Sequence, residues 1–296
     1  MSKKCFFAGL STLDIIYLIT CLPDDNGKEI AQRQLILSGG PATNAAVAFG
    51  HLGGESHLCS ALGKHLVSSI IKGEWGKYRI YHYDLSPEFA DFPPLSSIMI
   101  TKSTGARAIV SANASVFAEA ETKLSPKCFE VISTSDIVMV DGHQMETALQ
   151  LARYAREITK PVVFDGGSWK DGTDELLKYI DHAICSERFL PPGCKGSNDV
   201  ISYLNDKGVP HIAITRGAEA TLFYTRGNTG EISIPNIEYT IDTLGAGDIL
   251  HGAYCYYFVS GYPDMVSALK KATHIASYSC KYFGTREWME HFDIDT

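Results

Sequence analysis

Near its end the chain reads Asp242-Thr243-Leu244-Gly245-Ala246-Gly247-Asp248, and this stretch decides the fold. Glycines on both sides of an alanine let successive backbone N–H groups point in one direction. The residues that follow predict a helix over 248–259, so these amides would lie at a helix N-terminus, where the helix dipole favours negative charge. The pattern therefore predicts an anion-binding turn that uses the amides of Gly245, Ala246 and Gly247.

Asp248 comes directly after this turn. A carboxylate beside a bound phosphoryl group is placed to take a proton from an attacking hydroxyl. The same residues also fit a glycine-rich connection in which Asp248 only caps the helix. This stretch alone leaves both interpretations open.

A second glycine pair, Gly39-Gly40, precedes Pro41-Ala42-Thr43-Asn44 and a helix rich in small residues. Paired glycines allow a ligand to approach the backbone, and Asn44 offers both a donor and an acceptor. A tight turn before a packing helix is the alternative. Two further polar residues are weaker candidates for substrate contacts: Asp14 can instead be a cap, and Arg107 a solvated hairpin arginine.

Short apolar strands alternate with helical patterns along most of the chain. Buried strands are expected at 5–9, 137–141, 162–165, 182–186 and 211–215, and helices at 145–158, 173–179 and 199–207. This alternation predicts an α/β fold with a doubly wound, mostly parallel sheet that carries helices on both faces. Ligands bind such sheets at the carboxyl ends of the strands. The turn Thr215-Arg216-Gly217 follows one of these strands and fits a nucleotide contact, although simple turns share its composition.

Two segments, 15–37 and 96–111, break this alternation and read as antiparallel strand pairs. They predict a small β-sheet outside the main domain, able to act as a lid. We expect a main domain of 1–14, 38–95 and 112–296, and a lid of 15–37 and 96–111.

The composition excludes several classes of protein. A net charge of −8 without basic runs argues against nucleic-acid or anionic-membrane partners. No apolar run reaches the length of a membrane span, and the start does not resemble a signal peptide. The eight scattered cysteines form no C-x-x-C pair and are expected to be reduced thiols, so a cytoplasmic protein is expected.

Other ligand-binding motifs fail on single residues. Leu58 and His65 break the P-loop pattern around Gly63-Lys64, and Leu250 stands where a dinucleotide fold needs its third glycine. A nicotinamide dehydrogenase is therefore disfavoured. The ten histidines show no zinc-binding spacing.

Taken together, Gly39–Asn44 and Asp242–Asp248 resemble the two signatures of the ribokinase-like (PfkB) carbohydrate kinases. The resemblance covers about residues 4 to 285. It implies a ribokinase-like α/β domain with a small β lid, and transfer of the γ-phosphate of ATP to a sugar hydroxyl with Mg²⁺. It also implies that Asp248 is the base and that the amides of residues 245–247 form the anion hole.

The remaining site residues follow from the same resemblance. On the substrate side they are Asp14, Gly39, Gly40 and Asn44, with Arg107 as a further contact. On the nucleotide side they are Ser186, Glu187, Thr215 and Gly217, together with Gly245 and Gly247. Backbone carbonyls near Asp242 and Leu244 are implied for K⁺, and a homodimer through the lid is implied as the assembly.

Within the family, several stretches look like ketohexokinase and the sulfofructose kinase branch, which indicates a fructose-like ketose. Three stretches depart from the family pattern: residues 63–68 replace a usual acidic loop, Ser186-Glu187-Arg188-Phe189 replaces Asn-x-x-Glu, and Ala220 replaces a frequent glycine. Two alternatives stay open, namely a nucleoside kinase on the same fold and a non-catalytic protein that senses a sugar or nucleotide.

Overall fold

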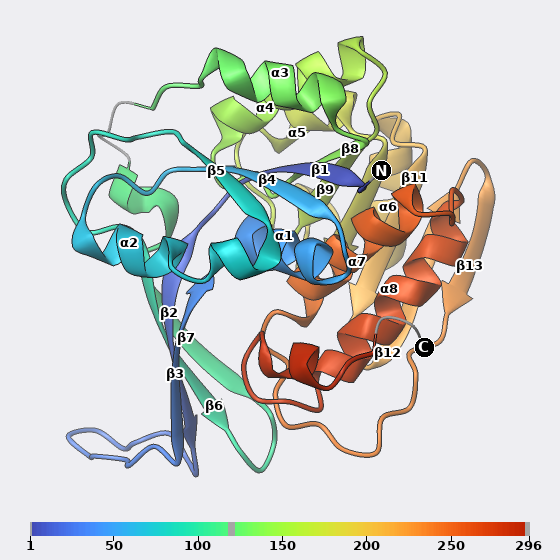
Figure 1. Cartoon of the computed structure of the whole chain (residues 1–296). Helices are drawn as coiled ribbons and strands as arrows, with labels where there is room; N and C mark the ends of the chain where they lie inside the picture. The colour runs from blue at the N-terminus through green and yellow to red at the C-terminus, as the bar shows by residue number, and fades with distance from the viewer. Residues whose placement is uncertain (1, 118–121, 294–296) are drawn as a thin grey trace.

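A nine-stranded sheet forms the centre of the protein (Figure 1) in a computed structural model that describes residues 2–117 and 122–293. Its order is β13-β12-β11-β10-β9-β8-β1-β4-β5. Pairing is parallel from β11 to β5, while β12 and β13 are antiparallel at one edge. The expected mostly parallel, doubly wound sheet is confirmed. The strands are β1 (Lys4–Ala8), β4 (Glu55–Ser60), β5 (Ile80–Asp84), β8 (Ile137–Val140), β9 (Val162–Gly166), β10 (His182–Ser186), β11 (His211–Arg216), β12 (Glu219–Thr225) and β13 (Asn228–Ile232).

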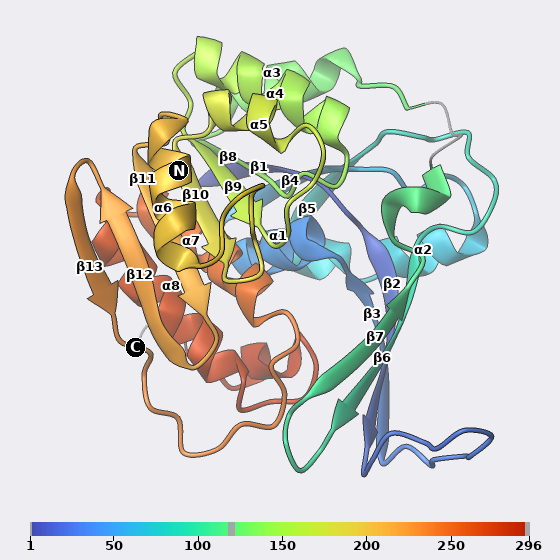
Figure 2. The same ribbon diagram turned by 180° about the vertical axis from the view of Figure 1, so that it is seen from behind.

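Helices cover both faces of this sheet (Figures 1 and 2). One face packs against α1, α7 and α8, and the other against α3, α4, α5 and α6. The central strands are apolar on both sides for this reason: in β1, Cys5 and Phe7 face one layer, and Phe6 and Ala8 face the other. The helices are α1 (Pro41–His51), α2 (Leu66–Lys72), α3 (Pro126–Thr134), α4 (Met145–Glu157), α5 (Thr173–Leu176), α6 (Ser197–Asp206), α7 (Ala246–Val259) and α8 (Met265–Ser279), with 3₁₀ turns η1 (Trp75–Tyr78), η2 (Asn113–Phe117), η3 (Leu177–Tyr179) and η4 (Glu287–Glu290).

Two of the expected helices differ in detail. The segment 173–179 is one turn of α-helix followed by a 3₁₀ turn. The helix expected at 248–259 begins at Ala246, because Gly245 adopts φ +69° and ends the preceding loop. Ala246 and Gly247 therefore belong to the first turn of α7.

A four-stranded sheet of order β3-β2-β6-β7 extends away from the main sheet (Figure 1). It consists of β2 (Thr12–Ile19), β3 (Arg33–Gly39), β6 (Leu95–Thr101) and β7 (Arg107–Ser111). Its inner face buries Ile16, Leu18, Ile98 and Ile100 against Phe283.

The expected small sheet is thus present, with strands that reach up to three residues beyond 15–37 and 96–111, and its role as a lid stays a prediction. Asp14 accordingly lies inside β2. The division into two domains remains a proposal, and its ranges also include residues 1, 118–121 and 294–296, which lie outside the described residues.

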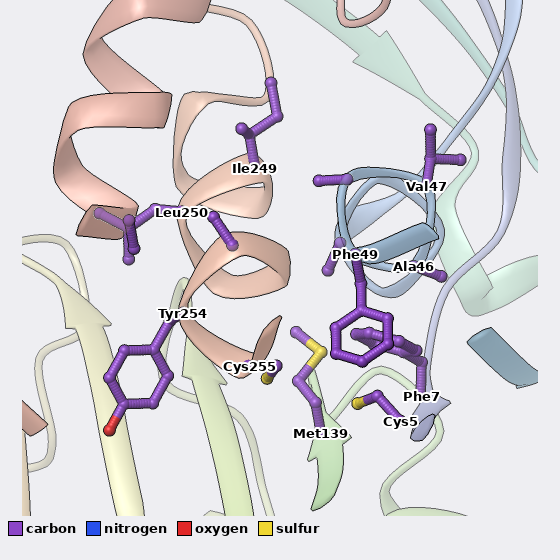
Figure 3. Close-up of a cluster of buried hydrophobic side chains, with 14 of the residues drawn as sticks. Cys5, Phe7, Ala46, Val47, Phe49, Met139, Ile249, Leu250, Tyr254 and Cys255 are labelled. Atoms are coloured by element: carbon purple, nitrogen blue, oxygen red, sulfur yellow. The ribbon is translucent and has the colours of Figure 1, made fainter. Parts of the chain in front are cut away.

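Helices α1 and α7 pack closely on the same face of the sheet. Figure 3 shows Phe49 of α1 and Cys255 of α7 facing Phe7 and Met139 of the strands below. A Cβ on Gly252 would overlap the carbonyl oxygen of Ala45, so only glycine permits this approach. In the part of the chain that the structure describes, every helix is too short or too polar to span a bilayer.

Candidate active site

The first turn of α7 presents backbone donors at the carboxyl edge of the sheet. Gly245 precedes it in the left-handed region, and a Cβ there would lie 2.6 Å from Cγ2 of Thr285. The amide of Ala246 makes only a long bond of 3.4 Å to the Thr243 carbonyl. Amides in the first turn of a helix have no helical acceptor, so this end can donate to a bound anion.

Asn44 and Asp248 meet although 204 residues separate them. Asn44 lies in the first turn of α1, which begins after Gly40 (φ +92°), and Asp248 lies in the first turn of α7. The Asn44 Nδ2 donates to Oδ2 of Asp248 at 2.8 Å. The close packing of the two helices therefore brings both sequence signatures into one site.

Arg286 determines which way the Asn44 amide faces. Its side chain is nearly fully buried, and Nη1 donates to Oδ1 of Asn44 at 3.0 Å. The amide oxygen is thereby occupied, which leaves the NH₂ group for Asp248. The guanidinium is itself held by the Ser38 carbonyl at 2.8 Å and by an ion pair with Glu74 at 3.2 Å.

Asp248 is surrounded by groups that alter its acidity. Burial raises the pKa of its carboxyl to about 7, and the nearby Asp165 contributes in the same direction. The hydrogen bond from Asn44 and the charge of His251 act against this rise in pKa. A carboxyl group with a pKa near neutrality is well suited to accept a proton at physiological pH.

Asp165 and His251 form a buried pair beneath the first turn of α7. Asp165 is the last residue but one of β9, and its Oδ2 lies 3.5 Å from Nδ1 of His251. The two ring nitrogens of His251 face the carbonyls of Gly247 at 2.7 Å and Ile184 at 3.0 Å. Only the imidazolium form donates to both carbonyls, and in that form it balances the carboxylate. Burial raises the pKa of Asp165, and the His251 charge opposes that rise.

Asp14 lies at the junction of the lid and the main sheet. It is buried, and Oγ1 of Thr12 donates to its carboxylate at 2.6 Å. A Cβ on Gly39 would overlap this carboxylate, and one on Gly40 would overlap the Leu10 carbonyl. Burial raises the pKa of Asp14, opposed by hydrogen bonds and by the charge of Arg286. Asp14, Gly39, Gly40 and Asn44 thus share one region.

Arg107 reaches from the lid to the loop before α7. Its Nη1 donates to Oγ1 of Thr243 at 2.9 Å and to the Thr243 carbonyl at 3.3 Å. In this structure the guanidinium therefore joins the small sheet to the loop that carries the predicted anion-binding turn.

Asp242 supports the same loop from within. Its two carboxylate oxygens accept from the amides of Leu244 and Gly284, each at 2.8 Å. The side chain is buried, and this burial raises its pKa. The side chain of Asp242 thus shapes the loop. The predicted K⁺ ligands are the backbone carbonyls of Asp242 and Leu244, which these side-chain bonds do not involve.

The expected nucleotide-side residues lie at the carboxyl ends of β10 and β11. The amide of Glu187 donates to the Thr215 carbonyl at 2.9 Å, and Oγ of Ser186 accepts from the Arg188 amide. Gly217 has φ +61° and open space around it. A cavity of about 470 Å³ lined in part by Arg216 opens beside this turn.

The sequence pattern of the pfkB family carbohydrate kinases matches residues 8–291. The chain belongs to this family. A deoxyribokinase from Salmonella typhi is 36% identical over 84 residues, which are 28% of this chain and 26% of that protein. The match thus spans about a quarter of that relative's length.

Solved structures support the fold of this pfkB-family chain. Arabidopsis thaliana ribokinase, complexed with ribose and ATP, has a TM-score of 0.77 at 20% identity, over 96% of this chain and 94% of that one. An adenosine kinase from Sinorhizobium meliloti has a TM-score of 0.78 at 15% identity, over 96% and 95% of the two chains.

Three residues of this pfkB-family site escaped the sequence analysis. Asp165 had a weak signal, because it is a polar residue at the end of a buried strand. His251 follows Asp248 by three residues, but the sequence around it gave no sign of its acidic partner. Arg286 had no signal at all, since nothing in its local sequence indicates that it is buried beside Asn44.

Proposed function

We propose that this pfkB-family protein is an ATP-dependent sugar kinase that transfers the γ-phosphate of MgATP to a hydroxymethyl group of a small carbohydrate. The observation that carries the proposal is the hydrogen bond from Asn44 to Asp248 at the start of α7. It brings the early signature to a carboxyl group of suitable pKa, which lies in the first turn of a helix whose N-terminus favours negative charge.

Asp248 is the proposed base. Asn44 occupies Oδ2, so Oδ1 is the oxygen that we assign to the substrate hydroxyl. With a pKa of about 7, the carboxylate is ionised in a large fraction of molecules at neutral pH and still binds a proton well. Arg286 is a positioning residue, because it acts on Asp248 through the Asn44 amide.

The first turn of α7 is the proposed anion hole. Charge develops on the migrating phosphoryl group, and the amides of residues 245–247 together with the helix dipole would stabilise it. His251 strengthens this arrangement because it binds the Gly247 carbonyl and fixes the turn. Closure of the lid over the site would exclude water and limit wasteful hydrolysis of ATP.

Magnesium bound with ATP would neutralise charge on the phosphates. Within the described ranges, no group of three or more His, Cys, Asp or Glu side chains could hold a metal ion. This suits Mg²⁺, which is usually held through phosphates and water with one or two carboxylates. The exposed Glu187 at the end of β10 is the carboxylate that we assign to these waters, and we assign K⁺ to the carbonyls of Asp242 and Leu244.

The substrate that we propose is a ketose such as fructose or a derivative, bound by Asp14, Gly39, Gly40 and Asn44 with Arg107 above. The support is the resemblance of local stretches to ketose kinases. The deoxyribokinase and ribokinase relatives make pentoses the first competitors to test. A nucleoside kinase is a second candidate, favoured by the structural similarity to an adenosine kinase.

We also propose a cytoplasmic homodimer that forms through the outer face of the lid. Ile36 on β3 and Val110 on β7 expose much of their apolar surface there, at 52% and 69%. Ile36 and Val110 lie on the two edge strands of the small sheet, and we assign this exposed apolar surface to the contact with a second chain.

The deciding experiment measures ATP consumption by the purified protein over ketoses, ribose, deoxyribose, sulfofructose and nucleosides, with Mg²⁺ and with or without K⁺. Rapid turnover of one ketose would support the proposal and name the substrate. Turnover of a pentose or nucleoside would replace the ketose, and ATP binding without any turnover would favour a sensing role.

A further inference from the structure

A cavity of about 620 Å³ opens at the opposite edge of the main sheet from Asp248. Its walls come from the first residues of β10 and β11, the last residues of β12, the end of α7 and the start of α8. A volume of this size suits a small organic molecule. Because parallel strands present their amino ends here, this cavity is separate from the candidate active site.

The cationic side chains of this cavity are not balanced by its acidic ones. Asp181 is engaged by an ion pair with Arg156, and Asp264 caps α8 by accepting from the Ser267 amide at 2.9 Å. Lys160 and Arg226 also line the cavity, and within the described residues neither side chain has a hydrogen bond or ion pair. Asp264 keeps its negative charge while it caps the helix, so three cations face two carboxylates in this cavity. In a chain of net charge −8, this local surplus of positive charge favours an anionic ligand.

Aromatic rings form another part of the cavity wall. His182 and His211 stack with centroids 4.6 Å apart, and Phe258 meets His182 edge-on at 4.7 Å. One nitrogen of each imidazole is engaged, by the hydroxyl of Tyr254 at 2.8 Å for His182 and by that of Thr225 at 2.6 Å for His211. These bonds hold the rings in fixed orientations. His182 is only 3% exposed, so His211 and Phe258 are the rings that offer flat surface to the cavity.

We propose that this cavity binds a small phosphorylated molecule. Lys160 and Arg226 would bind the phosphate, since ammonium and guanidinium groups make strong charge-assisted hydrogen bonds to phosphate oxygens. The rest of the ligand would lie against Phe258 and His211. The volume exceeds what an inorganic phosphate ion fills, which favours an organic phosphate.

Calorimetric titration with AMP, fructose 6-phosphate and inorganic phosphate tests this site. The probes are compared on the wild type, on the double variant Lys160→Gln/Arg226→Gln, and on a control, Lys178→Gln/Arg153→Gln, that removes the same charges outside the cavity. We expect one organic phosphate to bind the double variant at least about tenfold more weakly, with no change in the control.

Two results would overturn the proposal: equal affinity for every probe in all three proteins, or inorganic phosphate as the tightest ligand. The KM for ATP, or ATP affinity if there is no turnover, should be equal in the three proteins. Weaker ATP binding in the double variant would mean that Lys160 and Arg226 act on the active site, which would contradict a separate ligand site. Since the readout is binding, the test stands whether or not the protein is a kinase.

Discussion

Asp248 owes its proposed role to the groups around it. A free aspartate has a pKa near 4, whereas burial and Asp165 raise the pKa of this one to about 7. Two opposing contacts, the Asn44 amide and the charge of His251, keep the ionised form accessible. Catalysis by such a residue depends on the balance between these effects, which single substitutions can disturb.

Replacement of Asp248 by Asn should lower kcat by about a hundredfold or more, because the amide cannot accept the hydroxyl proton. The Asn44 Nδ2 can still donate to the new amide oxygen, so folding and ATP binding should be retained. Steady-state kinetics and ATP titration measure these two effects. Near-normal turnover would remove Asp248 from the mechanism.

The same variant should be more stable than the wild type above pH 7. The folded-state pKa of Asp248 is raised, so the folded protein binds this proton more tightly than the unfolded chain between about pH 4 and 7. The free energy of unfolding of the wild type therefore falls as pH rises through this window. In Asp248→Asn the side chain does not titrate, so this decrease in stability does not occur. Thermal melts at pH 5 and pH 8 should show the larger gain in Tm at pH 8.

Asn44→Ala should move the acid limb of the kcat/KM profile to higher pH. The wild-type profile should fall below about pH 7, as the base becomes protonated. Loss of the Nδ2 bond removes a contact that lowers the pKa of Asp248. The measurement is kcat/KM from pH 5.5 to 9. An unchanged profile with reduced activity would mean that Asn44 binds substrate without tuning the base.

At the scale of elements, the site depends on how closely α1 and α7 approach. Gly252 lies against the Ala45 carbonyl; it is one turn after Asp248 on α7, and Ala45 directly follows Asn44 on α1. A methyl group there must push the helices apart, because backbone atoms cannot yield as a flexible side chain does. Because residue 252 has no Cβ, α1 and α7 pack closely enough for Asn44 to reach Asp248.

Gly252→Ala should therefore cost both activity and about 1–3 kcal/mol of unfolding free energy. Gly76→Ala is the matched control, since a Cβ at Gly76 meets nothing within 4 Å. Denaturant unfolding and kcat are compared for the two variants. Full activity in Gly252→Ala would show that the helices can separate without harm to the Asn44–Asp248 pair.

Arg107 carries one of the contacts between the lid and the main domain, through its hydrogen bond to Thr243 in the loop before α7. Arg107→Ala should lower kcat/KM for the sugar by about tenfold and raise ATP hydrolysis without sugar, because the lid would close less firmly. Lys102→Ala removes another lid cation, one whose Nζ donates to Gln32 within the lid, and should have little effect. Equal behaviour of the two variants would contradict a role for Arg107 in closure.

At the scale of the whole molecule, the outer face of the lid is expected to join two chains. Ile36→Glu/Val110→Glu places two charges on this face and should give monomers in size-exclusion chromatography with light scattering. Ile70→Glu, on α2, also charges an exposed apolar residue and should leave the dimer intact. A wild type that is monomeric at micromolar concentration would exclude the proposed dimer.

The sequence by itself determined the layered architecture and the two turns that build the site. Alternating strands and helices predict a mostly parallel sheet because apolar strands need cover on both faces, and Gly40 and Gly245 mark positions where positive φ begins a helix. These features are local, so they can be read from neighbouring residues. The Asn44 and Asp248 candidates came from the same turns.

Only the tertiary structure decided which side chains support them. Arg286 reaches Asn44 across 242 residues, and His251 meets Asp165 on a neighbouring strand. Such contacts depend on which helices pack on which strands, and the local sequence pattern does not predict this packing. Burial likewise exists only in the folded chain, and it is burial that raises the pKa of Asp248 from that of an ordinary aspartate to about 7.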